Sequence, residues 1–364
     1  MEQDKKIRVG ITHGDINGIG YEVLLKTLSD TRIVELCTPV VYGSAKIAAF
    51  YRKNIDIPAF KLFQIENADD AAEDQINIIN IVPEDCKVEP GQATETAGKA
   101  AIAALERATA DLRGGLIDVL VTAPINKKTI HSEEFSFPGH TEYLQERIGE
   151  GKEAMMIMCS DSLRVALVTI HDAIAEVAPS ISAKAVLDKI LAFNRSLTED
   201  FGIHAPRIAV PGLNPHAGDA GVIGSEEDEI ITPAIAEASK RKVLAFGPYP
   251  ADGFFGSGAY RKFDGILAMY HDQGLIPFKL LAAENGVNFT AGLPYVRTSP
   301  DHGTAYDIAG QGVADEQSMR EAIYAAIDIY RNRQREAEAT ANPLRKQNFD
   351  RGSDKLPVEK KTND

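Results

Sequence analysis

Cysteine clusters, an excess of positive charge and long apolar runs are all missing from this sequence. Its three cysteines, Cys37, Cys86 and Cys159, are widely spaced and form no CxxC pair, which argues against a disulfide framework and against a thiolate zinc site. Lys and Arg number 39 against 53 Asp and Glu, so the formal net charge is −14. Such a charge disfavours broad electrostatic binding to nucleic acid or to anionic lipid. An anionic ligand must therefore be held by a local group of positive side chains.

No apolar run reaches the roughly 18 residues that a membrane-spanning helix needs. The first residues, MEQDKKIRVGIT, also lack the apolar segment of a signal peptide. We therefore expect a cytoplasmic protein without a membrane partner. Its 364 residues are 44% hydrophobic, which is enough for a large core in two domains or in one large α/β unit.

Short apolar runs alternate with longer helical patterns along most of the chain. The runs are IRVGIT, PVVYG, DVLVTAP, RVALVTI, RIAVPGL and GILAMY, and helices are expected over residues 21–29, 44–53, 182–196 and 226–241. This alternation is typical of an α/β protein with largely parallel strands. An Ala-rich pattern predicts a further helix over 94–115, ending at two glycines, and GILAMY is expected to lead into a turn.

The usual nucleotide-binding motifs are absent. The stretch THGDINGIGYE, residues 12–22, follows a predicted strand and precedes a predicted helix. Its glycines give the spacing GxxxGxG instead of GxGxxG, and no Gly-Lys-Ser/Thr follows, so neither a dinucleotide fingerprint nor a P-loop is present. A tight strand-to-helix turn and a ligand-facing loop explain this stretch equally well.

Three histidines stand at the ends of predicted strands. His171 closes RVALVTIH, His216 follows RIAV in PGLNPHAG, and His271 closes GILAMYH. Ligands of open α/β sheets gather at the carboxyl ends of the strands, and three neutral imidazoles there are suited to a catalytic divalent metal ion. Ordinary hydrogen-bonded loop histidines remain the alternative, because the spacing carries no local motif. Asp172 and Asp272 each follow a histidine, where a carboxylate could orient the ring or act as an acid or base.

A second group of residues is suited to binding phosphate or carboxylate. In FSFPGHTEYLQERIG, His140 and Thr141 precede an amphipathic helix, whose first N–H groups would face a ligand. An ordinary Thr N-cap is the alternative interpretation. Positive groups in a small and apolar stretch cost desolvation unless they meet an anion. Such a stretch downstream contains Lys279, Asn288 and Arg297.

Taken together, these segments resemble the 4-hydroxythreonine-4-phosphate dehydrogenase family, NAD-dependent enzymes of the deoxyxylulose-dependent vitamin B6 pathway. The resemblance covers residues 7 to about 333 and rests on the motifs GDINGIG, PGHTE, LRVALVTIH, GLNPHAG, LAMYHDQG and GVNFTAGLPYVRTSPDHGTAYDIAG. It implies that His171, His216 and His271 bind a divalent metal. It also implies substrate contacts for His140, Thr141, Lys279, Asn288 and Arg297. Asp252, in PADGFF, matches an acidic position near the substrate and is a candidate catalytic residue.

The resemblance extends to the cofactor. DHGTAYDIAGQGVAD is similar to the HGSAPDIAG loop of isopropylmalate and isocitrate dehydrogenases, where the adenosine of the nicotinamide cofactor lies. It implies that His302, Gly303, Thr304 and Asp307 bind NAD, with NADP as the alternative.

The fold implied is that of isocitrate and isopropylmalate dehydrogenases, with two α/β/α domains and an active site in the cleft between them. We expect residues 1–128 and 285–334 to form the cofactor-side domain, and 129–284 to form the domain of the metal site and the dimer contact. Members of the family are homodimers whose metal site draws ligands from both subunits. Residues 335–364 are polar, charged and poor in large apolar groups, which predicts a disordered tail.

The reaction implied is oxidation of 4-phosphohydroxy-L-threonine to 2-amino-3-oxo-4-phosphooxybutanoate, which decarboxylates to 3-amino-2-oxopropyl phosphate in pyridoxal and pyridoxine phosphate biosynthesis. A divalent ion (Zn, Mg, Mn or Co) would lower the pKa of the reacting hydroxyl while hydride passes to NAD. Oxidation of D-threonate or D-erythronate 4-phosphate is the alternative within the family. More remote alternatives are a metal-dependent phosphohydrolase, which would release phosphate without NAD, and a non-catalytic protein that binds a phosphorylated metabolite.

The sequence departs from the family in the N-terminal glycine loop. Relatives commonly read TPGEPAGIGP there, whereas this chain has five other residues at the corresponding places: His13, Asp15, Ile16, Asn17 and Tyr21. The glycines of the loop are retained. We therefore expect the turn to persist with altered contacts.

Overall fold

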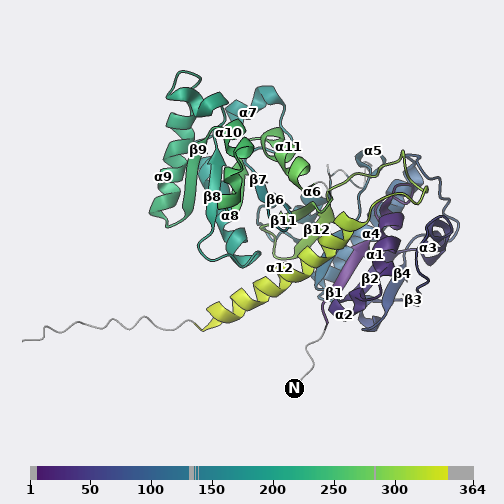
Figure 1. Cartoon of the computed structure of the whole chain (residues 1–364). Coiled ribbons are helices and arrows are strands. Elements are labelled where there is room, and N and C mark those ends of the chain that lie inside the picture. Colours follow the sequence, from purple (N-terminus) through teal and green to yellow (C-terminus); the bar gives the residue numbers. More distant parts are fainter. Residues whose placement is uncertain (1–5, 131–134, 136, 138, 283, 343–364) are drawn as a thin grey trace, which may run out of the picture.

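The computed structural model describes residues 6–130, 135, 137, 139–282 and 284–342, which form a mixed α/β fold around one large sheet (Figure 1). The strands of this part of the chain are β1 (Arg8–Thr12), β2 (Thr38–Gly43), β3 (Leu62–Ile65), β4 (Ile76–Asn80), β5 (Val119–Thr122), β6 (Met155–Cys159), β7 (Arg164–Leu167), β8 (Arg207–Pro211), β9 (Leu244–Tyr249), β10 (Gly265–Ala268), β11 (Val287–Ala291) and β12 (Val296–Pro300). Their order is β3-β4-β2-β1-β5-β12-β11-β6-β7-β10-β8-β9. Neighbours are parallel except at β12–β11, β11–β6 and β6–β7, so the prediction of largely parallel strands is confirmed.

Helices cover both faces of this sheet. They are α1 (Gly20–Ser29), α2 (Ile33–Leu36), α3 (Ala45–Arg52), α4 (Glu95–Arg113), α5 (Lys127–Ile130), α6 (His140–Ile148), α7 (Ile174–Ser180), α8 (Ala183–Glu199), α9 (Thr232–Lys240), α10 (Ala251–Gly256), α11 (His271–Leu281) and α12 (Gln317–Ala341). Short 3-10 turns η1 (Ala68–Asp70), η2 (Pro215–Asp219) and η4 (Ala259–Lys262) and a π-helical turn η3 (Glu227–Ile231) complete the set. Among the described residues, no helix has both the length and the apolar character that a membrane span requires.

The last two strands of the chain join two lobes. Strands β1 to β5 form one part of the sheet and β6 to β10 the other, while β12 pairs with β5 and β11 pairs with β6 between them. Figure 1 shows the two lobes, with α12 running across the junction. The proposed domain boundaries near 129 and 284 stay a prediction, because one sheet runs without interruption through both parts.

Local sequence signals predicted most of the helices that flank β1, β2, β5 and β8. The predicted helices over 21–29, 44–53, 94–115 and 182–196 correspond to α1, α3, α4 and α8. Three of them begin at a hydroxyl residue that accepts a backbone N–H three residues on: Ser44, Thr94 and Ser182. The predicted helix over 226–241 is divided between η3 and α9.

The predicted turn after GILAMY is wrong, because α11 begins directly at His271. Gly274 and Pro277 lie inside this helix and weaken its sequence pattern. The glycine is required by packing: a Cβ at Gly274 would lie 2.8 Å from side-chain atoms of Leu167 and Val165. The helix is therefore set by close contact with β7, which the local sequence does not reveal.

Part of the segment predicted to be a disordered tail is helical. Helix α12 continues through Ala341, so residues 335–341 are helical although they are mostly exposed. Their sequence, REAEATA, is rich in residues with high helix propensity, which favours continuation of the helix. The rest of the predicted tail, 343–364, lies outside the described residues.

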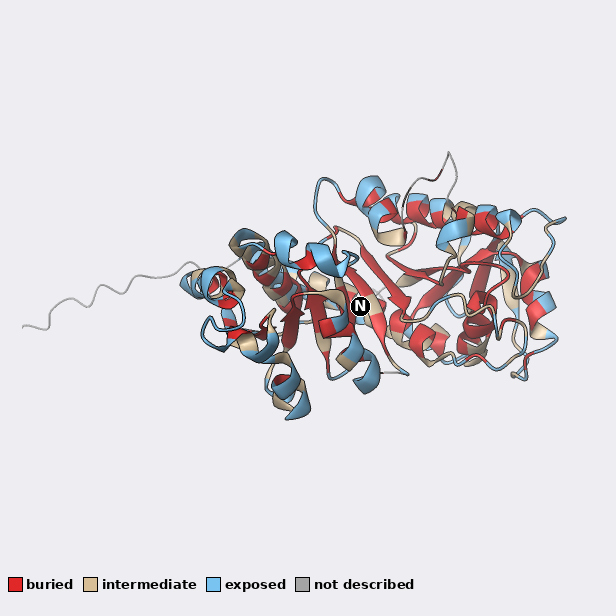
Figure 2. Cartoon of the chain, turned by 90° about the horizontal axis from the view of Figure 1, so that it is seen from above, coloured by how far each residue is buried: buried red, intermediate tan, exposed pale blue. Residues whose placement is uncertain are grey.

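The two faces of the central strands serve different purposes. The Thr298 hydroxyl donates to the carbonyl of Ala322 in α12, so this face of β12 packs against α12. Side chains alternate along a strand, and Arg297 therefore projects from the opposite face. Thr290 and Asn288 of β11 share that face, since Thr290 accepts a hydrogen bond from Arg297. Figure 2 shows these buried central strands between the helical layers.

Candidate active site

Arg297 is a buried cation without a carboxylate partner among the described residues. Only 3% of its surface is exposed, and its guanidinium donates to the Thr122 hydroxyl at 2.6 and 3.1 Å and to the Thr290 hydroxyl at 3.0 Å. Burial lowers the pKa of Arg297 to about 10, so the group stays charged at neutral pH. Two neutral hydroxyls do not balance a buried positive charge. The position is therefore suited to an anionic ligand, as the sequence suggested.

His140 lies beside this cation at the start of α6. The helix begins at His140 after an extended Gly139, and no side chain caps it, so the alternative of a Thr141 N-cap is wrong. The Nε2 atom of His140 is buried without a hydrogen-bond partner. Burial, reinforced by the charges of Arg297 and Lys127, holds the pKa of His140 well below its usual range. A neutral imidazole and the free N–H groups of the helix start thus face the same region as the guanidinium.

Asn288 and Lys279 are two further predicted substrate contacts. Asn288 lies on the same face of β11 as Thr290, and its Oδ1 atom is buried without a partner. Lys279, in the last turn of α11, donates to Asp301 Oδ1 at 2.9 Å and is half exposed. We use the name anion cluster for Arg297, His140, Thr141, Asn288, Thr122 and Thr290.

His171 and His271 lie side by side where β7 and β10 end. Backbone hydrogen bonds between β7 and β10 continue past the last residues of the two strands. The N–H groups of Val168 and Thr169 donate to the carbonyls of Ala268 and Met269 at 2.9 and 3.1 Å. The two imidazole rings have centroids 5.9 Å apart. They line a cavity of about 310 Å³ together with Asp172 and Asp272, among others. The structure thus brings together two of the three predicted metal ligands.

His216 lies on η2 after β8, in an unusual backbone segment. Residues 216–220 all have positive φ, between 44° and 78°. Left-handed backbone costs about 1–2 kcal/mol for each residue with a side chain, so this segment must be held from outside. Among the described residues of one chain, no group of three or more His, Cys, Asp or Glu side chains has the arrangement of a metal site. His216 therefore does not complete the His171 and His271 pair within a single chain.

Two side chains that sequence reasoning missed hold the His216 loop in place. Buried Glu227 accepts from the Asn214 backbone N–H at 2.7 Å and from the Asn214 side chain at 3.0 Å. Gln273 donates to the Gly212 carbonyl at 2.6 Å and accepts from the Met269 N–H at 2.8 Å, so it joins the β8 loop to the end of β10. Gln273 lies two residues after His271 in the motif LAMYHDQG. Its place in this motif was the sequence feature that could have identified it.

Asp252 stands apart from both groups. It is exposed on α10, which packs against η2, so it belongs to the neighbourhood of His216. Charged residues of α5 and α6, in contrast, act on the histidine pair. Burial lowers the pKa of His171, and the charges of Lys127 and His271 lower it further, against the effect of Glu142 and Asp172. Lys127 comes from α5, and Glu142 comes from α6, the helix that carries His140 and Thr141 of the anion cluster.

The predicted cofactor residues lie on the loop that follows β12. The Nε2 atom of His302 is buried without a partner, and burial lowers the pKa of this imidazole. Gly303 faces open space, and Asp307 is exposed. Thr304 contacts the N-terminal glycine loop: its carbonyl accepts from the Ile19 N–H at 3.0 Å and lies 2.8 Å from where a Cβ of Gly18 would be. Glycine at 18 is therefore required by the approach of these two loops.

The altered residues of the glycine loop make structural contacts. Asp15 accepts from the Tyr306 hydroxyl at 2.7 Å and from the Asn17 N–H at 2.8 Å. The His13 ring stacks on Tyr21 with centroids 5.1 Å apart, and neither of its nitrogens has a partner among the described residues. The turn persists, as the sequence predicted, and its new side chains tie it to the loop after β12.

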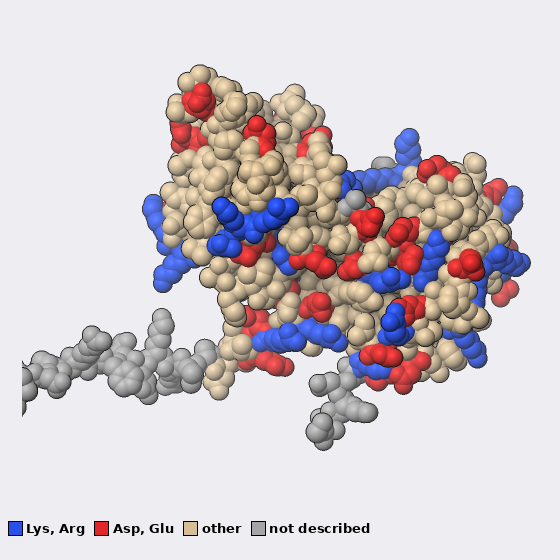
Figure 3. All heavy atoms as spheres, viewed as in Figure 1, with Lys and Arg blue, Asp and Glu red and all other residues tan. Residues whose placement is uncertain are grey.

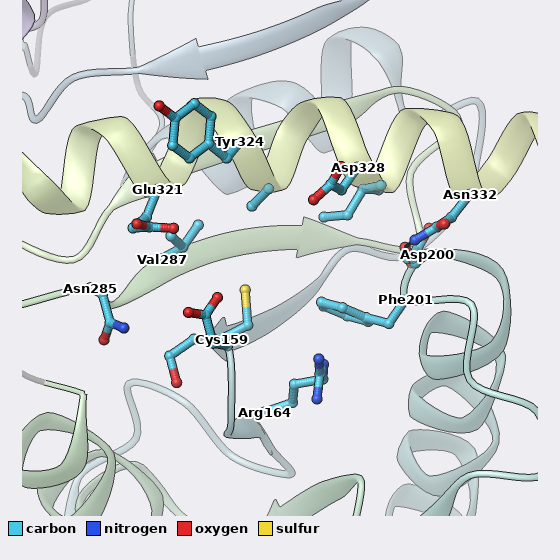
Figure 4. A pocket seen from close by; sticks show the side chains of 14 residues that line it. Cys159, Arg164, Asp200, Phe201, Asn285, Val287, Glu321, Tyr324, Asp328 and Asn332 are labelled. Carbon is cyan, nitrogen blue, oxygen red and sulfur yellow. Dashed lines mark hydrogen bonds between the residues drawn. The ribbon is translucent and has the colours of Figure 1, made fainter. Parts of the chain in front are cut away.

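Another cavity lies on the opposite face of the sheet. It has a volume of about 230 Å³ and is bordered by α12, as Figure 4 shows. Its lining includes four carboxylates and one arginine: Asp161, Asp200, Glu321, Asp328 and Arg164. The excess of negative charge would repel a phosphorylated ligand. On the face drawn in Figure 3, Lys and Arg side chains are interspersed with Asp and Glu over the described residues, without the continuous basic surface that nucleic acid requires.

Comparison with known proteins identifies the family. Residues 35–326 match the family model described as pyridoxal phosphate biosynthetic protein PdxA. The chain is 58% identical over 360 residues to a 4-hydroxythreonine-4-phosphate dehydrogenase of Bacteroides thetaiotaomicron, which covers 98% of both chains. It is 39% identical to a D-threonate 4-phosphate dehydrogenase of Cupriavidus necator, covering 88% of this chain and 96% of that protein.

A solved structure agrees with these matches. The crystal structure of 4-hydroxythreonine-4-phosphate dehydrogenase from Klebsiella pneumoniae superposes with a TM-score of 0.79 at 35% identity, covering 91% of this chain and 99% of that one. The predicted α/β fold class is thereby confirmed. The chain therefore belongs to the PdxA family and is an oxidoreductase of the dehydrogenase type.

Proposed function

We propose that this chain oxidises 4-phosphohydroxy-L-threonine to 2-amino-3-oxo-4-phosphooxybutanoate, using NAD and a divalent metal ion. The oxidised acid then loses carbon dioxide to give 3-amino-2-oxopropyl phosphate, a step of pyridoxal phosphate biosynthesis in the cytoplasm. The observation that carries the proposal is Arg297, a buried cation without a carboxylate partner among the described residues, in a chain that also brings His171 and His271 together at its strand ends. The 58% identical relative of that name supports the choice of substrate.

The anion cluster binds and orients the substrate in this proposal. Arg297 and the N-terminus of α6 attract an anionic group, and Thr141 adds a hydroxyl. Neutral His140 can exchange a hydrogen bond with the ligand without adding charge. The unpartnered Oδ1 atom of Asn288 accepts a hydrogen bond from a hydroxyl or amino group. Fixing several substrate groups at once aligns the reacting carbon.

The donor set at the strand ends is suited to a divalent metal ion. His171 and His271 present neighbouring imidazoles, and Nδ1 of His271 lies 2.8 Å from Asp272 Oδ1, a contact that orients the ring. When bound there, a Zn, Co, Mn or Mg ion would lower the pKa of the reacting hydroxyl and stabilise negative charge on its oxygen. His216 would supply the third ligand across a subunit interface.

A homodimer would bring that third ligand within reach. Large apolar side chains are exposed around the histidine pair and the His216 loop: Ile174 on α7, Val222 after η2, and Ile276 and Leu280 on α11. Ile174, Val222 and Leu280 are each more than 70% exposed, which is costly in water and is typical of a surface that a partner covers. A second copy of the chain is the partner that the incomplete ligand set requires.

The loop after β12 is suited to the adenosine part of a nicotinamide cofactor. The unpartnered Nε2 atom of His302 and the open space at Gly303 provide a polar contact and room, while Thr304 and Asp307 flank them. NAD would supply the hydride acceptor. NADP is the alternative cofactor.

The proposal is tested by following NADH absorbance with purified protein, divalent metal and 4-phosphohydroxy-L-threonine. The same assay is run with D-threonate and D-erythronate 4-phosphates, and the His271→Ala variant is the control. Turnover of the aminated substrate that is lost in the variant supports the proposal. Turnover of the sugar-acid phosphates alone favours the second candidate function, which the D-threonate 4-phosphate dehydrogenase relative motivates. Release of phosphate without NADH, or binding without turnover, would contradict both.

A further inference from the structure

We propose that Lys127 is a further substrate-binding residue, and that its ammonium group pairs with the carboxylate of the substrate while Arg297 and the start of α6 hold the phosphate. This inference rests on the proposed function, because it assumes a substrate with these two anionic groups. Lys127 is the first residue of α5 and was not among the predicted site residues.

The backbone at Lys127 is held at the edge of the sheet where the site lies. Helix α5 follows β5, whose last residue, Thr122, fixes Arg297. The preceding residue, Asn126, donates to the Tyr306 hydroxyl at 2.9 Å and accepts from the Lys128 N–H at 2.9 Å. The segment that carries the lysine is thus tied to the loop after β12.

The Lys127 side chain lies beside the anion cluster. Its Cε atom is 3.9 Å from where a Cβ of Gly139 would lie, which places it beside the start of α6. Its charge, like that of Arg297, also contributes to the low pKa of His140 in the anion cluster. A ligand bound at the anion cluster is therefore within reach of the ammonium group.

The balance of charges assigns the carboxylate to this lysine. The proposed substrate carries two anionic groups, and the candidate cations among the described residues are Arg297, Lys279 and Lys127. Lys279 is already paired with Asp301, and Arg297 acts together with a helix N-terminus and hydroxyls, the combination that best suits a phosphate. Lys127 is exposed and makes no ion pair with the described residues. It is thus the cation left for the carboxylate.

The test measures the steady-state rate of NADH formation for Lys127→Ala, Lys127→Arg and the matched control Lys128→Ala, whose side chain is also exposed. The same proteins are assayed for competitive inhibition by inorganic phosphate. We expect KM to rise about 10- to 100-fold in Lys127→Ala, as for loss of a charged hydrogen bond, with partial recovery in Lys127→Arg. The control should stay within about twofold of wild type, and the inhibition constant of phosphate should stay within about twofold in all three variants.

Two results would overturn the inference. A Lys127→Ala variant that behaves like Lys128→Ala would show that the lysine does not bind substrate. An inhibition constant of phosphate that rises together with KM would assign Lys127 to the phosphate instead. If wild-type protein forms no NADH, the proposed function fails separately. Calorimetric binding of the phosphorylated acids to wild type and Lys127→Ala then decides the inference, which equal affinities would refute.

Discussion

The anion cluster and the histidine pair are built in opposite ways. Arg297 is enclosed by the sheet and held by hydroxyls of two neighbouring strands, all from one chain. His171 and His271 stand beyond the ends of their strands, in a cavity open to solvent, and their proposed partner His216 is held in a separate loop. A site inside a sheet is preorganised by folding alone, whereas a site at strand ends depends on what docks against it. Four predictions examine this difference, from the largest expected effect to the smallest.

Replacing Arg297 should abolish activity. Arg297→Met keeps the apolar length of the side chain but removes the buried charge, so kcat/KM for NADH formation should fall by about a thousandfold or more. Arg164→Met is the matched control, because Arg164 is a half-buried arginine on the opposite face of the sheet. The control should stay within about threefold of wild type when the two proteins melt at similar temperatures. An active Arg297→Met enzyme would contradict the assignment of the anion cluster.

Mixing two inactive variants should restore activity if the metal site is shared. His216→Ala and His271→Ala each remove one proposed ligand. In a mixed dimer, one site would combine His271 of the first variant with His216 of the second and would be complete. After unfolding and refolding of an equal mixture, about one quarter of wild-type activity should return, because half of the dimers are mixed and each has one intact site. No recovery, with dimers observed by light scattering, would place all ligands in one chain.

The buried His13 should make the protein less stable in acid. Burial lowers the pKa of His13 to about 4, below the value near 6.5 of an unfolded chain. Protonation therefore favours the unfolded state, so stability falls as the pH drops from about 6.5 to about 4, by roughly 3 kcal/mol. Urea unfolding should show a smaller loss over this range in His13→Phe. The exposed histidine variant His204→Phe is the control and should follow wild type; identical pH profiles for all three would contradict the prediction.

Removing the Tyr306 hydroxyl should have the smallest effect. It donates to Asp15 and accepts from Asn126, so Tyr306→Phe removes one hydrogen-bond partner from each of these two side chains. The free energy of unfolding should fall by about 1–3 kcal/mol, because unsatisfied buried groups are costly. Tyr324→Phe, on α12, is a control whose hydroxyl makes no hydrogen bond that the described residues record. Equal unfolding midpoints in urea for the two variants would refute a structural role for this hydroxyl.

Sequence reasoning reached different parts of the two sites. Arg297 and Asn288 were predicted to bind an anion because polar groups in an apolar stretch are costly without a ligand, and this role stays a prediction. Thr122 and Thr290, which hold the guanidinium, were not recognised, since their contact depends on the register of three strands. His171 and His271 were correctly expected at strand ends. The resemblance implied metal ligands from two subunits, but the left-handed loop that carries His216 was not foreseen, because it is held by Glu227, eleven residues later, and by α11 through Gln273.

The sequence by itself determined the alternation of strands and helices, the positions of the strand-end histidines and the family of the chain. These properties depend on side-chain periodicity and on short motifs, which are local. Tertiary structure decided which face Arg297 occupies, which histidines meet and where Lys127 reaches. Those outcomes depend on strand order and on contacts between segments more than a hundred residues apart, such as Thr122 with Arg297. No local pattern encodes such contacts, because they exist only after the sheet has formed.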